Sequence, residues 1–79
     1  MSESSKRLLS ALMVLGAQSP ERAIAIDELA ARLGLGAREI EIELKRLVEA
    51  GYARMVQQPG NSRVYLTGTG IITASSTYS

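Results

Sequence analysis

The sequence predicts an α+β fold in which three helices surround one apolar core and a small antiparallel β-hairpin follows. Two patterns indicate this fold. Apolar residues recur at helical spacing between residues 37 and 50, and a Pro59-Gly60 pair separates two short apolar segments. The length of 79 residues fits a single domain over 1–79, with a core over residues 4–67 and a tail over residues 68–79.

The first helix is expected over Ser4–Leu15, which contains no helix breaker and is followed by Gly16. Steps of 100° per residue give one leucine stripe, which neighbouring apolar residues widen until little polar surface is left. The apolar positions are Leu8, Leu9, Leu12, Met13, Val14 and Leu15. A helix of this kind is buried on more than one side.

A short strand and a short helix are expected next. A turn around Pro20 leads to the strand, over Ala23–Ile26. Asp27 is the expected N-cap of the second helix, because its side chain can accept from a free amide of the first turn. Gly34 is expected to end that helix.

The third helix and the hairpin follow from clearer signals. The helix is expected from about Ala37 to Ala50, and its inner stripe is Ile40, Leu44, Leu47 and Val48. Strands are then expected over Tyr52–Gln58 and Arg63–Leu66. Pro59-Gly60 supplies the fixed φ and the permissive position of a type II turn between them.

These segments together resemble a winged helix-turn-helix domain. The run from Ile26 to Leu35 resembles its first half, and Ile40 to Tyr52 resembles its recognition helix and the entry to its wing. The resemblance covers about residues 8 to 70. It is similar in style to the multiple-antibiotic-resistance-regulator group of bacterial and archaeal transcription factors. It implies a DNA-binding regulator, although winged helices also serve as protein–protein interaction modules.

The chain departs from that pattern in two places. Gly36 stands where the family prefers a Ser or Thr N-cap before the third helix. The family pattern also implies a fourth helix after Gly70. The glycines and β-branched residues of the tail predict that this helix is short, frayed or replaced by an extended segment.

The outer face of the third helix is the candidate DNA-reading surface. Arg38 is placed to donate to a guanine edge, Ile42 to touch a thymine methyl, and Lys45 and Arg46 to meet phosphates. The candidate backbone contacts of the wing are Arg54, Asn61, Ser62 and Arg63. Alternatively, this face is simply solvated, with Glu41–Lys45 and Glu43–Arg46 as helix-stabilising pairs, or Ile42 contacts a protein partner.

A homodimer is the expected assembly, because a chain this short is marginal alone and carries surplus apolar surface. The candidate interface residues are Leu9, Met13, Val14, Ile71 and Ile72. The alternative is that the tail covers the first helix within one chain.

Composition excludes much enzyme chemistry. There is no Cys and no His, and we find no catalytic constellation, so neither an enzyme, a metal nor a cofactor is expected. No apolar run approaches the ~20 residues of a membrane span, so a cytoplasmic protein without membrane contact is expected. The net charge of +1 is low for a nucleic-acid binder, so the placement of the charges has to carry that prediction.

Overall fold

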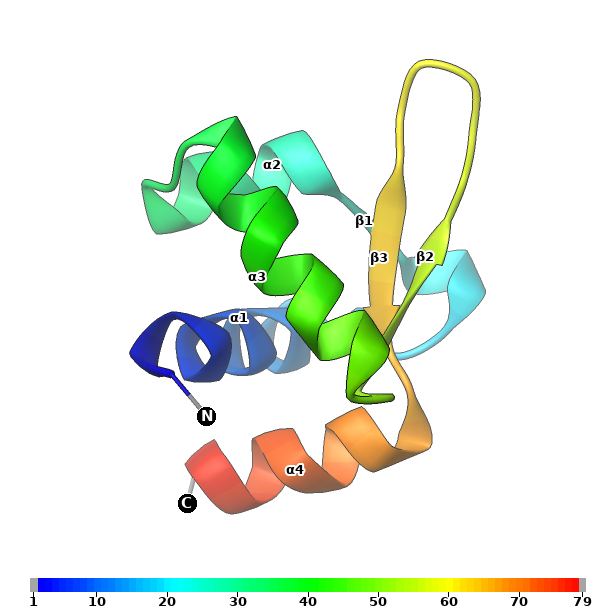
Figure 1. The fold of residues 1–79 in the computed structure, drawn as a ribbon. Helices are drawn as coiled ribbons and strands as arrows, with labels where there is room; N and C mark the ends of the chain where they lie inside the picture. The colour runs from blue at the N-terminus through cyan, green and yellow to red at the C-terminus, as the bar shows by residue number, and fades with distance from the viewer. Residues whose placement is uncertain (1, 79) are drawn as a thin grey trace.

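The computed structural model describes residues 2–78, with side chains over residues 2–76. Helices and a three-stranded sheet share one core, which confirms the predicted α+β class. The elements run in the order α1 (Glu3–Val14), η1 (Pro20–Arg22), β1 (Ile24–Ala25), α2 (Ile26–Leu33), α3 (Ala37–Glu49), β2 (Ala53–Val56), β3 (Arg63–Leu66) and α4 (Gly68–Tyr78) (Figure 1).

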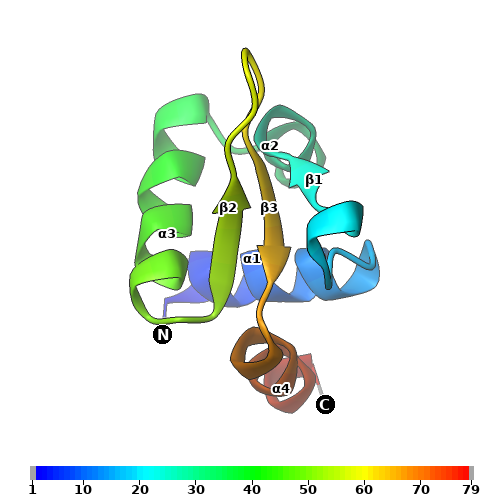
Figure 2. The ribbon, with the colours of Figure 1, turned by 90° about the vertical axis from the view of Figure 1, so that its right-hand side faces the viewer.

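The sheet is antiparallel, with strand order β1-β3-β2, so β3 lies in the middle (Figure 2). Val64 of β3 is opposite Ile24 on one side and Met55 on the other. The hairpin turn is as predicted. Gly60 has a φ of 75°, and the amide of Asn61 donates to the carbonyl of Gln58 at 3.0 Å, as in a type II turn.

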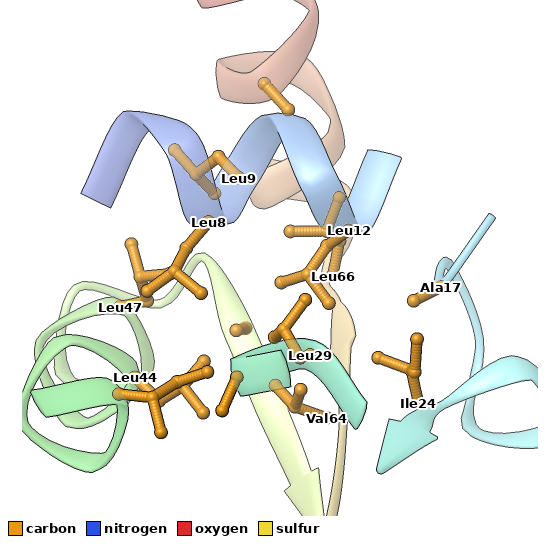
Figure 3. Close-up of a cluster of buried hydrophobic side chains, with 14 residues drawn as sticks. Leu8, Leu9, Leu12, Ala17, Ile24, Leu29, Leu44, Leu47, Val64 and Leu66 are labelled. Atoms are coloured by element: carbon orange, nitrogen blue, oxygen red, sulfur yellow. The ribbon is translucent and has the colours of Figure 1, made fainter. Parts of the chain in front are cut away.

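The core lies between α1, α2, α3 and one face of the sheet (Figure 3). Its largest fully buried side chains are Leu8, Leu9, Leu12, Leu29, Ile40, Leu44, Leu47, Val64 and Leu66. The predicted inner stripe of α3 is therefore confirmed at Ile40, Leu44 and Leu47, while Val48 is partly buried at the edge. Because the inner stripe fixes how α3 is rotated, it also decides which residues of α3 face outward.

The start of α2 differs from the prediction. Helix α2 begins at Ile26 directly after β1, its N-cap is Ala25, and no side chain caps it. The amide of Ile26, one of the free donors at the start of the helix, donates to the carbonyl of Ser62 at 3.1 Å, so the residue before β3 satisfies it. The prediction of Asp27 as N-cap is therefore wrong. Asp27 lies in the first helical turn, where the helix dipole favours a carboxylate.

The tail also differs from the prediction, because Gly68–Tyr78 is a continuous helix of 11 residues. Thr67 begins it: its hydroxyl accepts from the amide of Gly70 at 3.0 Å and donates to the carbonyl of Gly51 at 2.6 Å. Helix α4 then packs against α1 and buries Ala74 completely (Figure 1). Tertiary packing thus overrides the poor helix propensity of the tail. None of the helices within residues 2–78 is long and apolar enough to cross a membrane.

Candidate nucleic-acid interface

Helix α3 presents a mixed cationic and apolar face to solvent. Its inner residues Ile40 and Leu44 are buried, so the residues about half a turn away point outward. Ile42 is 48% exposed there, and Arg38, Lys45 and Arg46 are exposed around it. Gly36 is the N-cap of α3 and provides no side-chain hydrogen bond, as the sequence indicates.

The cations of this face differ in their partners. Within the part of the chain that has described side chains, Arg38 and Lys45 make no ion pair. The Nη1 of Arg46 lies 3.2 Å from Oε1 of Glu43, so the predicted pair forms, and the Arg46 side chain stays 62% exposed. The alternative Glu41–Lys45 pair is not formed among these residues. Two of the three cations are therefore free to meet an anionic ligand.

Glu43 has a role that the sequence analysis missed. Its side chain is only 12% exposed, and its Oε2 accepts from the hydroxyls of Ser5 at 2.8 Å and Ser2 at 3.3 Å. The carboxylate therefore joins α3 to the first turn of α1. The spacing could have revealed this, because Glu43 lies three residues after Ile40 and four before Leu47, at the edge of the apolar stripe.

The predicted wing residues fall into two groups. Asn61 and Ser62 lie in the hairpin loop and, with Lys45, line an open cleft of about 710 Å³ between α3 and the hairpin. Arg54 is exposed on β2, opposite Tyr65, and lines a separate hollow beside the start of α4. The structure thus brings the loop residues to the side of α3 that carries Lys45, whereas Arg54 faces a different region.

Arg63 and Ser62 are already engaged within the fold. The Nη1 of Arg63 donates to the carbonyl of Ala23 at 3.2 Å, which ties β3 to the residue before β1. The hydroxyl of Ser62 donates to Oε1 of Gln57 at 3.2 Å across the loop. Arg63 is partly buried, so part of its hydrogen-bonding capacity serves the sheet rather than a ligand.

The candidate dimer residues divide by exposure. Leu9 is fully buried within the single chain, in the core where α4 packs on α1, so its assignment to an exposed interface is corrected. Met13 and Ile71 are partly buried against the same core. Val14 and Ile72 remain 66% and 70% exposed. The tail therefore covers part of α1, as the alternative prediction had it, and leaves two large apolar side chains in solvent.

The described residues contain no group of three or more acidic, His or Cys side chains placed to hold a metal ion. The polar side chains around the outer face of α3 and the cleft carry cationic, amide, hydroxyl and carboxylate groups. Such groups bind by charge and hydrogen bonding.

Comparison with known proteins places this geometry in a known fold. No family model matches the chain, and no curated protein matches it. Among solved structures, a candidate DNA-binding protein from Ralstonia eutropha has a TM-score of 0.86 at 21% identity, over 100% of this chain and 99% of that one. TubR from Bacillus megaterium has a TM-score of 0.83 at 20% identity, over 89% of this chain and 78% of that one.

A mutant of the regulator MarR from E. coli, solved with operator DNA, is similar as well. Its TM-score is 0.82 at 20% identity, over 99% of this chain but 54% of that one, so the present chain spans about half of MarR. At these identities the likeness concerns the fold, and it confirms the winged helix expected from the sequence.

Proposed function

We propose that this protein is a double-stranded-DNA-binding regulator of transcription that inserts α3 into the major groove. The observation that carries the proposal is the outer face of α3, where Arg38 and Lys45 form no ion pair with any residue whose side chain is described and lie beside the exposed Ile42. A helix of a helix-turn-helix reads base edges with such residues. The solved MarR complex with operator DNA has the same fold and supports this assignment.

Each residue then has a distinct task. Arg38 lies in the first turn of α3 and is assigned to a base edge, where a guanine offers two acceptors to a guanidinium. Ile42, one turn later, is assigned to a thymine methyl. Lys45 and Arg46 are assigned to phosphates. Arg46 can bind a phosphate while its Nη1 remains paired with Glu43.

The hairpin loop is assigned to the adjacent backbone. Asn61 and Ser62 line the same cleft as Lys45, so a phosphate that reaches Lys45 comes close to their amide and hydroxyl groups. Arg54 and Arg63 are weaker candidates, because Arg54 lines another hollow and Arg63 donates to Ala23.

The proposed assembly is a homodimer in the cytoplasm, where chromosomal DNA is accessible to a bacterial or archaeal regulator. Among the residues with described side chains, Val14 on α1 and Ile72 on α4 are large apolar residues left exposed, and Val14 lies beside Leu33 of α2 at a shallow hollow. A second copy would cover them. It would also double the phosphate contacts and allow two half-sites to be read about one helical turn apart.

The test is binding to duplex DNA of random sequence at about 50 and about 200 mM salt, with the mass in solution recorded alongside. Several phosphate contacts predict a loss of affinity by orders of magnitude between the two conditions. The absence of binding at the lower salt would overturn the DNA assignment. The exposed Ile42 would then favour the second candidate function, a winged helix that binds a protein partner.

A further inference from the structure

The cleft between α3 and the hairpin has the size of a small-molecule site. Its volume of about 710 Å³ is within the range of ~300–1,000 Å³ that ligand pockets occupy in proteins. Residues from α2, α3, β2 and the hairpin loop line it, so its walls come from four separate parts of the fold. A site built in this way is positioned by the core rather than by one mobile loop.

The walls of the cleft are apolar in their deeper part. Ile26, Val48 and Met55 line it, and all three are partly buried hydrophobic residues that pack against the core. Leu44, which is fully buried, lies beneath them. Each of the three keeps some surface in contact with water, and an apolar ligand group would remove that surface from water.

The rim of the cleft is acidic. Asp27 comes from α2, and Glu41 and Glu49 come from α3. All three are exposed, and none forms an ion pair within residues 2–76. Among the described residues that line the cleft, Lys45 is the one cation, so three carboxylates face one ammonium group there. Low-dielectric walls concentrate this negative potential on whatever enters the cleft.

We propose that the cleft binds an amphipathic organic cation, a small molecule with an apolar body and an ammonium or amidinium group. The apolar body would cover Val48 and Met55, and the cationic group would lie against Glu41, Glu49 or Asp27. An anionic ligand of the same shape, seated between the walls, would meet three carboxylates and one ammonium group and is disfavoured; the proposed phosphate contact is with Lys45 and the hairpin loop at the opening of the cleft. A neutral one would gain the apolar contact alone.

A cation bound in the cleft should compete with DNA, and this expectation rests on the proposed function. Lys45, Asn61 and Ser62 line the cleft and are also assigned to the DNA backbone. A molecule seated there occupies space that a phosphate needs, so the cation and DNA compete. The binding of the cation itself requires no DNA, and the two proposals can therefore fail separately.

The test uses two probes with nearly the same apolar body and opposite charge, 4-phenylbutylammonium and 4-phenylbutyrate. Each is titrated into the full chain without DNA, and the Met55 methyl resonance is followed by NMR. For a cation of this size we expect a dissociation constant of about 1–5 mM. We expect binding of the anion to be at least about fivefold weaker.

Two rim variants and one matched control locate the site. Glu41→Gln and Glu49→Gln remove rim carboxylates, whereas Glu39→Gln makes the same change at an exposed residue of α3 that does not line the cleft. Each rim variant should weaken binding of the cation by roughly two- to fivefold, and Glu39→Gln should leave its dissociation constant unchanged. Equal binding of the two probes, or equal losses for Glu39→Gln and the rim variants, would overturn the proposal. Thermal melting verifies that all variants are folded.

Discussion

The Oγ of Ser5 donates a hydrogen bond of 2.8 Å to Oε2 of Glu43, joining the first turn of α1 to the middle of α3. The other carboxylate oxygen, Oε1, accepts from Nη1 of Arg46 at 3.2 Å. One residue therefore holds two helices together and orients a cation of the proposed DNA-binding face. Burying a carboxylate is unfavourable unless such partners surround it, so this cluster acts as a unit.

Glu43→Ala should destabilise the fold by about 1–3 kcal/mol, because it leaves the buried hydroxyl of Ser5 without its acceptor. Glu39→Ala is the matched control on the same helix, since Glu39 is exposed and forms no ion pair among the residues with described side chains. It should change stability by less than about 0.5 kcal/mol. Urea denaturation measures both, and equal effects would mean that the Ser5–Glu43 bond contributes nothing.

Gly70 and Gly68 form a second matched pair, in the first turn of α4. A Cβ on Gly70 would overlap the carbonyl oxygen of Tyr52, whereas a Cβ on Gly68 meets nothing within 4 Å. Gly70→Ala should therefore lower the free energy of unfolding by about 2 kcal/mol or more, because the backbone at Tyr52 must shift or α4 must detach. Gly68→Ala should be neutral or stabilising by up to about 1 kcal/mol. Thermal melting of the two variants tests this difference. An unchanged melting temperature for Gly70→Ala would contradict the close contact between Gly70 and the Tyr52 carbonyl.

The dimer prediction depends on Val14 and Ile72. Because both are largely exposed in the single chain, Val14→Lys and Ile72→Lys should leave the monomer folded and shift the mass in solution from two chains to one. Leu9→Ala is the contrasting variant. It should destabilise the fold itself by about 2–5 kcal/mol, because Leu9 is fully buried. A monomeric wild type, or a dimer that tolerates both lysines, would refute this interface.

The Arg38→Ala and Lys45→Ala variants should impair DNA binding in different ways. Lys45→Ala should weaken binding to all duplexes about equally and reduce the salt slope by about 1, as loss of a phosphate contact does. Arg38→Ala should relax the preference at one base pair by about 1–3 kcal/mol. Selection of preferred sites from a random duplex pool, repeated with each variant, distinguishes the loss of a phosphate contact from the loss of a base contact. The same loss of preference for both would contradict the assigned roles.

Much of the fold follows from local sequence. The spacing of Ile40, Leu44 and Leu47 predicts α3 because a period of 3.6 residues is a property of the helix itself. Pro59-Gly60 predicts the turn because φ restrictions act on single residues, and β3 has the bounds Arg63–Leu66 that were expected. These elements need no knowledge of distant neighbours.

The differences arise where distant segments meet. Helix α4 depends on Gly70 fitting against Tyr52, and the start of α2 depends on an amide of Ile26 that bonds to Ser62. In the candidate site, the outward face of α3 follows from its periodicity. The burial of Glu43 by Ser5, and the separation of Arg54 from the hairpin loop, require the tertiary arrangement. Sequence spacing alone does not contain these contacts.

In the proposed function, DNA affinity depends on the cations on the outer face of α3 and not on the net charge of the protein. The most direct measurement compares Lys45→Glu with Arg22→Glu on one duplex at about 50 mM salt. The two variants change the net charge equally, and Arg22 is exposed on η1, across the sheet from α3 (Figure 2). We predict a loss of about tenfold or more for Lys45→Glu and less than about threefold for Arg22→Glu. Equal losses, or no binding by the wild type, would contradict the claim.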